Sequence, residues 1–340
     1  MIFPDPPVEV SIEVEPRCNF RCPFCFNKLS FAKRGRGKIA SLSSEYVKKV
    51  ISQVHKAGTR SVRITGGEPL LHPDILDILE HAGSLGFKEV WLLTNGSLID
   101  NKLAARLVKY AGYFSLPIES PTNAQEDRFT GFKNSLALKL KALHCLKSAG
   151  AKFLRVTTVV TRRAIADLDR IAAVLAGAPV SNWALKRPIP LGERFLIDNG
   201  DVEILLDKLS AIKDQGKVDC DIECPFPFCA AKDPGRMSRL NKWTSIGGYA
   251  RFSVDPRGYA KPNFFTDINI GDPLDPLACW NHPLMRKLRN LDFLPDECAD
   301  CRYKNKCRGG SRFIAKLVSG DYRAPDPLAT DSALRLGTRR

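Results

Sequence analysis

Three cysteines, Cys18, Cys22 and Cys25, have the spacing Cys-x3-Cys-x2-Cys, which is the arrangement in this chain with the clearest chemistry. Three thiolates on one short loop can converge on a single metal centre. They are one ligand short of a closed tetrahedral zinc site, and they leave one iron of a four-iron cubane without a protein ligand. An open iron can bind a small molecule through an amine and a carboxylate. An incomplete zinc site and a chance grouping are the alternatives.

The triplet follows an apolar, alternating run at residues 8–14, which indicates a strand with the cysteines on the loop after its end. With the aromatic Phe24 directly before Cys25, the triplet resembles the signature of the radical SAM enzymes. The resemblance implies a [4Fe–4S] cluster whose open iron binds S-adenosylmethionine (SAM). In that family, reduction of SAM releases methionine and leaves a 5′-deoxyadenosyl radical that abstracts hydrogen from a substrate. The cofactors carry out this chemistry and the protein binds and orients them, so no catalytic side chain is assigned.

A second motif, Gly-Gly-Glu-Pro at residues 66–69, follows the next expected strand. Two glycines allow backbone to approach a ligand closely, and a carboxylate can accept hydrogen bonds from an ammonium group. The family resemblance implies that Gly66, Gly67 and Glu68 hold the amino group of SAM. The alternative is a tight strand-to-helix turn with an exposed glutamate. Its place one strand–helix unit after the cysteines supports the family assignment.

Two further polar residues follow later strands. Asn95, in Thr-Asn-Gly, is a candidate SAM contact by resemblance, although Asn-Gly is also a common turn. Glu119 stands where relatives with a C-terminal cluster domain carry an aspartate, and Thr130 where they carry an arginine. The resemblance implies that Glu119 contacts the SAM ribose or the substrate, and these two departures weaken that implication.

Strands and helices alternate with short connections, which predicts parallel strands joined by right-handed crossovers. We expect a partial (β/α)6 barrel of the TIM type, as the resemblance also implies, with chemistry on the loops after the carboxyl ends of the strands. After residues 8–14, strands are expected at 61–65, 89–94, 113–118, 153–160 and 183–187, and helices at 44–57, 73–85, 100–110, 134–149, 165–176 and 201–212.

From about Lys217 the alternation stops and Pro, Gly and Cys become dense. We therefore expect a radical SAM core at residues 1–215 and a small, irregular, cysteine-rich domain at 216–340. In the second part, Cys298-x2-Cys301-x5-Cys307 followed by Arg-Gly-Gly resembles the SPASM domain, a C-terminal module that usually holds two auxiliary iron–sulfur clusters.

The departures from that module are systematic. Ser311 and Ala329 stand where the module has cysteines, a third cysteine position falls near Thr244 or Ser245, and a fourth is Asn263. These losses empty one auxiliary site, while the other keeps Cys298, Cys301 and Cys307 without a fourth thiolate.

Three interpretations of this second site are open. The remaining cluster has an open iron for substrate, or a ligand such as Cys229, Cys279 or Asp326 completes it, or no cluster remains. One auxiliary cluster is favoured, because three closely spaced thiols without metal are prone to oxidation. Zinc is the competing metal.

The other cysteines carry weaker signals. Cys220, Cys224 and Cys229 have a spacing that matches no familiar cluster motif, and they are candidate ligands or structural thiols. Cys145 lies within an expected helix and is most simply a buried apolar thiol.

The whole chain has 340 residues, 44% of them hydrophobic, with a net charge of +15 and eleven cysteines. No apolar run is long enough for a transmembrane helix and no secretory signal is apparent, so a cytoplasmic protein without membrane partners is expected. Thiols stay reduced there, which favours metal ligation over disulfides. The charge is weak evidence for a nucleic-acid partner, because the densest basic runs, residues 33–38 and 335–340, lack interleaved aromatics.

We therefore expect a radical SAM enzyme that acts in peptide or protein maturation or in cofactor biosynthesis. The implied partners are a small reductant protein of the flavodoxin or ferredoxin type and a peptide or small-molecule substrate. The first strand begins within a few residues of Met1, which makes an N-terminal leader-peptide module less expected. RNA modification and a non-catalytic protein that binds SAM at an iron–sulfur cluster are the alternatives.

Overall fold

The computed structural model describes residues 6–26, 39–190, 196–243 and 247–329. Among the residues singled out above, the two basic runs and the Thr244–Ser245 position lie outside this set. The chain divides into two compact units: unit 1 comprises residues 1–156, 177–181 and 247–286, and unit 2 comprises residues 157–176, 182–246 and 287–340. The domain boundary expected near residue 216 remains a prediction. The two compact units group residues by their contacts in space, so segments far apart in the sequence can share a unit.

Unit 1 is built on parallel strands. β1 (Glu9–Glu15), β2 (Ser61–Gly66), β3 (Glu89–Leu93) and β4 (Tyr113–Pro117) pair in this order, each parallel to the next. In register, Ile12 of β1 lies opposite Ile64 of β2, which lies opposite Leu92 of β3. The loops that follow these three strands therefore begin at the same edge.

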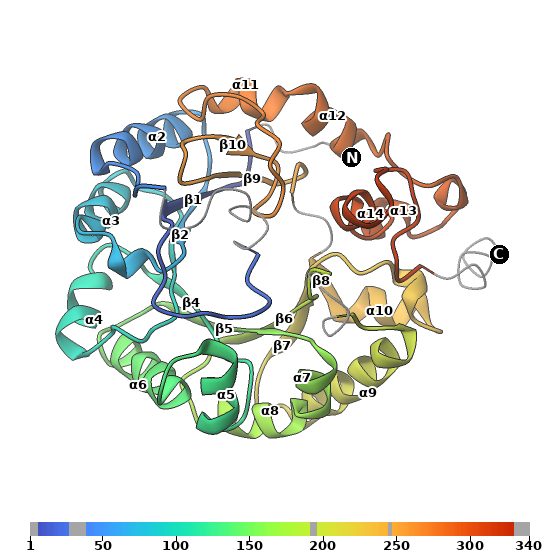
Figure 1. The fold of residues 1–340 in the computed structure, drawn as a ribbon, viewed down its shortest axis with the longest axis horizontal. Helices are drawn as coiled ribbons and strands as arrows, with labels where there is room; N and C mark the ends of the chain where they lie inside the picture. Colours follow the sequence, from blue (N-terminus) through green and yellow to red (C-terminus); the bar gives the residue numbers. More distant parts are fainter. Residues whose placement is uncertain (1–5, 27–38, 191–195, 244–246, 330–340) are drawn as a thin grey trace. The chain divides into compact units, whose positions relative to one another are not determined.

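The helices of unit 1 lie on one side of these strands (Figure 1). They are α2 (Ser44–Lys56), α3 (Ile75–Ser84), α4 (Asn101–Leu107), α5 (Asn123–Thr130) and α6 (Ser135–Ser148). α2 shows why the sequence folds this way: the Ser43 side chain accepts a hydrogen bond from the Tyr46 amide at the helix start. Its buried residues, Val47, Val50, Ile51 and Val54, recur at helical spacing and form one apolar face.

A later segment of the chain returns to unit 1. β9 (Arg251–Val254) pairs in parallel with β1, and β10 (Ala260–Lys261) pairs antiparallel with β9. α11 (Pro276–Asn281) follows within the same unit, and the boundary between the units falls inside α12 (Pro283–Asn290). The sequence placed residues 247–286 with the C-terminal domain, because a pairing between strands about 240 residues apart leaves no local signal.

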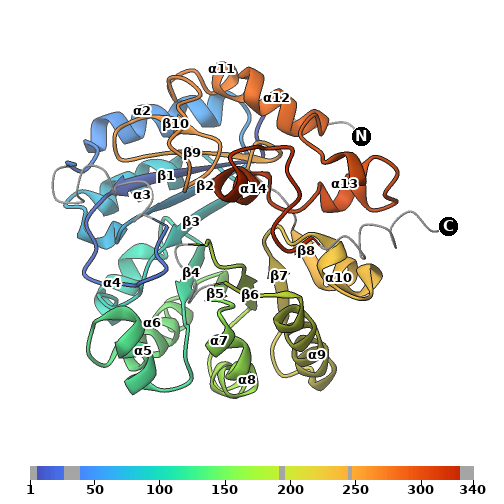
Figure 2. The ribbon, with the colours of Figure 1, turned by 45° about the vertical axis from the view of Figure 1, so that its right-hand side comes forward.

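Unit 2 continues the alternation. β5 (Phe153–Val159) crosses the boundary between the units, and α7 (Arg162–Ala166) and α8 (Leu168–Ala176) follow it. β6 (Asn182–Lys186), β7 (Cys220–Glu223) and β8 (Asn241–Trp243) pair in parallel in this order. Figure 2 shows α8 and the next helix, α9 (Asn199–Gln215), side by side along these strands. α9 begins with a capping box between Asp198 and Asp201 and ends at the left-handed Gly216.

The remainder of unit 2 is short and irregular. It contains the 3-10 turns at Phe228–Ala230 and Asp296–Cys298, with α10 (Pro234–Leu240), α13 (Lys304–Cys307) and α14 (Arg312–Ser319). None of the described helices has the length and apolar character needed to cross a bilayer.

The expected strands and helices are present with small shifts at their ends. The expected helix at 165–176 is two helices, α7 and α8, that meet at Asp167. Up to the end of β7, one helix and one strand were missed, and no elements were predicted after it. α5 is short and polar, so it has no apolar periodicity, and β7 has only four residues between turn-forming neighbours. The alternation therefore continues through β7, α10 and β8, two strands beyond the point where the sequence indicated that it stops.

Candidate functional site

Cys18, Cys22 and Cys25 lie on the loop that directly follows β1, as expected, and all three are half-buried. The Cys25 amide donates to the Cys22 carbonyl (3.3 Å), and the Phe20 amide lies 3.4 Å from the Cys18 sulfur. Burial raises the pKa of the Cys22 thiol to about 12, and the nearby Cys25, Glu119 and Cys18 act in the same direction while Lys139 opposes them. The three thiols are therefore close enough to influence one another.

The donor set fits an iron–sulfur cluster. No three His, Cys, Asp or Glu side chains among the described residues converge closely enough to hold a single metal ion. A cubane does not require such convergence, because each thiolate binds a different iron. Three soft sulfur ligands on one loop match a cubane with one iron left for a small molecule.

The cysteine loop rests on α5 and on the residues just after it. The ring of Phe24 lies 5.8 Å from that of Phe129, and the ring of Phe20 lies 5.1 Å from that of Phe132. The Arg21 amide donates to the Thr130 carbonyl (2.6 Å). Phe24 therefore supports the loop in this structure, and its contact with a cofactor remains a prediction.

Gly66 and Gly67 pack against the backbone that leads into the cysteine loop. A Cβ at Gly66 would lie 2.3 Å from the Glu15 carbonyl oxygen, and one at Gly67 would lie 2.2 Å from that of Arg17. The Gly67 amide donates to the Glu15 backbone carbonyl (2.5 Å), and the Glu68 amide donates to the Arg17 backbone carbonyl (2.8 Å). Only glycine fits, since real Cβ atoms never come so close to backbone oxygens. The two glycines thus fix the second motif to the base of the first.

The Glu68 carboxylate is fully buried and connects the second loop to the third. One oxygen accepts from Thr94 Oγ1 (2.6 Å) and the Leu70 amide (3.0 Å), and the other accepts from the Asn95 amide (2.7 Å). Burial raises its pKa to about 7, although these three hydrogen bonds act in the opposite direction. A carboxylate has about four acceptor sites, so at most one remains for a ligand. The alternative of an exposed glutamate is excluded.

Asn95 joins the third loop to the first. Its Nδ2 donates to Asn19 Oδ1 (2.7 Å) and lies 3.9 Å from the Cys18 sulfur, and its Oδ1 accepts from the Ser97 amide (2.9 Å). Asn19 in turn donates to the Ser97 hydroxyl (2.8 Å). The loops after β1, β2 and β3 are thereby held together by buried or half-buried polar contacts. Asn19 was not predicted as a site residue, because its only signal in the sequence is its place next to the first cysteine.

A buried ion pair lies beside Cys22. Lys139 of α6 is 1% exposed and its Nζ is 2.5 Å from Glu126 of α5, which is 0% exposed. The second Glu126 oxygen accepts from the Glu119 amide (3.0 Å), and Lys139 also faces the Phe20 ring at 5.2 Å. Glu119 is therefore positioned near Cys22, as its effect on that thiol shows. No local sequence signal indicates the pair, because its members lie on different helices.

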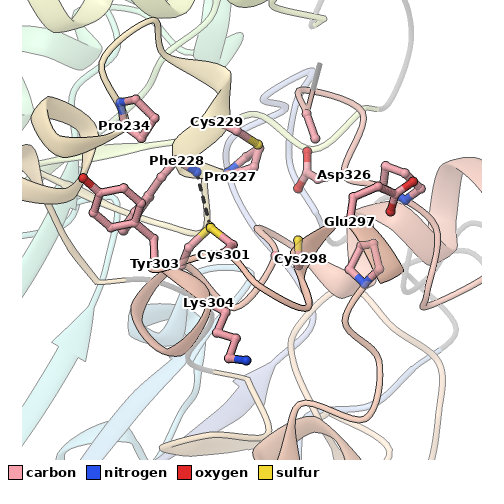
Figure 3. Close-up of a pocket in the computed structure, with 15 residues that line it drawn as sticks. Pro227, Phe228, Cys229, Pro234, Glu297, Cys298, Cys301, Tyr303, Lys304 and Asp326 are labelled. Atoms are coloured by element: carbon pink, nitrogen blue, oxygen red, sulfur yellow. Dashed lines mark hydrogen bonds between the residues drawn. The ribbon is translucent and has the colours of Figure 1, made fainter. Parts of the chain in front are cut away.

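The second group of cysteines surrounds a pocket within unit 2 (Figure 3). Cys298, Cys301 and Cys307 line it together with Cys229 and Asp326, around about 550 Å³ of space that is partly open to solvent. Burial raises the pKa of the Cys307 thiol to about 11, whereas the amides of Phe228, Gly310 and Gly309 favour its thiolate. The expected triplet is thus brought together, and a fourth thiol joins it.

The remaining cysteines have other surroundings. Cys220 is fully buried in β7, and the Cys224 sulfur accepts from the Arg187 amide (2.8 Å) while its thiol donates to the Leu185 carbonyl (3.7 Å). The Cys279 thiol, in unit 1, donates to the Asp272 carbonyl (3.1 Å). Cys145 is buried in α6, as expected. Of the 220/224/229 group, only Cys229 lies at the pocket.

Comparison with known proteins finds the same family that the first cysteine motif resembles. The family model described as the Radical SAM superfamily matches residues 12–174. The PqqA peptide cyclase of Gluconobacter oxydans (strain 621H) is 26% identical over 351 residues, which cover 97% of this chain and 92% of that protein. The protein of the same name from Granulibacter bethesdensis is 25% identical over 349 residues, with 95% and 87% covered.

Solved structures agree in fold. The crystal structure of Streptococcus suis SuiB bound to precursor peptide SuiA has a TM-score of 0.77 at 16% identity, covering 96% of this chain and 77% of that one. Native anSMEcpe with bound AdoMet has a TM-score of 0.74 at 16% identity, with 97% and 95% covered. The expected fold class is confirmed: an α/β partial barrel with a cysteine-rich C-terminal region.

Proposed function

The chain is a radical SAM enzyme, and we propose that its substrate is a peptide or a protein. One observation carries the choice of substrate: the likeness to the PqqA peptide cyclases extends over 97% of this chain, beyond the radical SAM match at residues 12–174 and into the cysteine-rich region. The likeness therefore covers more than the radical SAM region, and the name of those relatives specifies a peptide.

In this proposal Cys18, Cys22 and Cys25 hold the [4Fe–4S] cluster. The cluster, when bound, supplies the electron that cleaves SAM to the radical that abstracts hydrogen from the substrate. Gly66 and Gly67 keep the second loop against the cysteine loop, and the Glu68 carboxylate orients the backbone of residues 70 and 95. We assign Glu68 a positioning role, and Gly66, Gly67 and Glu68 remain candidate contacts for the amino group of SAM. Asn95 and Glu119 remain candidate contacts.

The electron donor is proposed to be a small protein of the flavodoxin or ferredoxin type, because the cluster must be reduced one electron at a time. A cytoplasmic setting is part of the same proposal. All eleven cysteines are free thiols in the structure, which suits a reducing compartment.

The test uses the reconstituted, reduced protein with SAM and a clarified extract, not desalted, of the cells that produce it. The measured quantity is 5′-deoxyadenosine above the extract-free rate. We expect stimulation that protease treatment of the extract abolishes and ribonuclease treatment leaves intact. Stimulation that survives protease would contradict a peptide substrate: sensitivity to ribonuclease would then indicate RNA, and resistance to both enzymes a small molecule.

A further inference from the structure

Four thiols line one pocket of unit 2, although the sequence separates one of them from the rest by about 70 residues. Cys298, Cys301 and Cys307 belong to a single short segment, and Cys229 comes from the 3-10 turn Phe228–Ala230 after β7. Figure 3 shows the thiols of Cys229 and Cys298 facing the same space. The four cysteines therefore surround one space.

Asp326 also lines the pocket, but its carboxylate is already occupied. Arg187 binds both of its oxygens at 2.8 Å, and the amides of Ser311 (2.8 Å) and Leu328 (3.0 Å) donate one hydrogen bond to each. Four donors fill the four acceptor sites of a carboxylate. Asp326 therefore holds the pocket walls together and has no lone pair left for a metal.

Two backbone features suit a thiolate ligand at Cys307. Arg308, Gly309 and Gly310 follow it with φ values of 58°, 70° and 76°, a left-handed run that turns successive amides back toward the preceding residue. A Cβ at Gly310 would lie 2.5 Å from an Asp326 oxygen, so this turn requires glycine. The Phe228 amide, directly before Cys229, donates to the Cys307 sulfur (3.3 Å). Such N–H contacts to sulfur are typical of iron–sulfur ligands.

We propose that Cys229 is the fourth thiolate of a [4Fe–4S] cluster held with Cys298, Cys301 and Cys307. Ala329, which stands where the related module has its fourth cysteine, lines the same pocket, so Cys229 supplies from another segment what that position lacks. A zinc ion would need its ligands within about 2.3 Å of one point, whereas a cubane distributes them over four irons.

This assignment has a chemical consequence. With four protein thiolates no iron would be open, so a cluster held here would bind no substrate atom, and the chemistry that it could supply would be electron transfer. The interpretation in which an open iron of this cluster binds substrate is thereby replaced.

The test isolates the second site by changing Cys18, Cys22 and Cys25 to alanine in the full chain. This parent should retain about four irons and four sulfides. It should also resist mild oxidation, because a fully ligated cubane has no labile iron. Adding Cys229→Ala should lower the iron content or leave a cluster that loses one iron on oxidation, seen as a new [3Fe–4S] signal by electron paramagnetic resonance.

Two further variants separate ligation from folding. Cys229→Ala combined with Ala329→Cys should restore the parent iron content and its resistance to oxidation, because it returns a fourth thiol to the pocket from the other side. Cys220→Ala, a buried cysteine of the neighbouring strand, should leave both properties unchanged. The same substitutions in the wild-type background, with circular dichroism, check the fold.

Three results would overturn the proposal. They are zinc in place of iron in the parent, a Cys229→Ala variant as oxidation-resistant as the parent, and an equal loss of iron in Cys220→Ala. None of these readouts involves a peptide or SAM cleavage. Failure of the proposed substrate therefore leaves this inference intact, and the converse also holds.

Discussion

At the scale of single residues, Glu13 of β1 is a buried acid whose ionisation opposes folding. Its side chain is fully buried, and neither carboxyl oxygen has a hydrogen-bond partner among the described residues. Burial raises its pKa from 4.5 to about 7; Asp255 adds to this effect, and Lys261 and Arg257 oppose it. The folded chain therefore binds a proton here that the unfolded chain releases, and stability falls as pH rises through this interval.

We predict that Glu13→Gln stabilises the protein at high pH. Glutamine cannot ionise, so the variant does not lose stability as pH rises. Its free energy of unfolding should therefore exceed that of the wild type by an amount that grows from pH 5.5 to pH 8. A rise of about 2.5 pKa units corresponds to an upper value of about 3 kcal/mol. Anaerobic thermal unfolding at several pH values measures the difference.

A matched control is Glu45→Gln on the exposed face of α2, which should shift the unfolding temperature by the same small amount at every pH. If the Glu13→Gln advantage were equally independent of pH, the ionisation of Glu13 would not be its source.

The residue scale also shows what the sequence could not predict. The motif residues were identifiable because cysteine spacing and the Gly-Gly-Glu-Pro order are local. Their partners were not, because Glu68 meets Thr94 and Asn95 from a different loop. The function of a carboxylate in a motif depends on which of its acceptor sites the fold has already used.

At the scale of elements, the close packing of the β2 loop on the β1 loop positions the cysteines. We predict that Gly67→Ala moves the β2 loop away from the cysteine loop, since the alanine Cβ would lie 2.2 Å from the Arg17 carbonyl oxygen. The variant should lose most of the iron held by the first cysteine triplet, measured as iron per chain after anaerobic reconstitution. Its unfolding temperature should also fall.

Gly150→Ala is the control for backbone strain alone. Gly150 has φ +99° and nothing within 4 Å of an added Cβ, so alanine there should cost about 1–2 kcal/mol without changing the iron content. Equal iron in Gly67→Ala and the wild type would show that the glycine contact does not position the cluster loop.

Most elements were predictable because their apolar periodicity and caps are local. Ser43 and Asp100 accept hydrogen bonds at helix starts, and Gly216 ends α9, and these residue types are typical of those positions. α5 was not predictable: it is polar on nearly every face, and its buried Glu126 is explained only by Lys139 on the next helix. The pairing of β9 with β1 depends on distant residues and was equally inaccessible.

At the scale of the whole molecule, the chain has two groups of cysteines with different coordination. The triplet after β1 has three thiols, so a four-iron cluster held there would keep one iron without a protein ligand. The group in unit 2 has four thiols around one pocket. The first group is local in sequence and was predicted in full. In the second group three members were identified from their spacing, and Cys229 was one of three candidates for the fourth ligand, because only the folding of unit 2 brings it to the pocket.

The central claim is that Cys18, Cys22 and Cys25 hold a cluster whose open iron binds SAM. Electron–nuclear double resonance on the reduced, full-length protein tests it most directly, with isotopes on the amino nitrogen and carboxylate oxygen of SAM. The account predicts hyperfine couplings from both nuclei in the wild type and neither coupling in the Cys18/Cys22/Cys25 alanine variant. A reduced wild-type cluster that showed no coupling with SAM bound, or couplings that persisted in the variant, would contradict it.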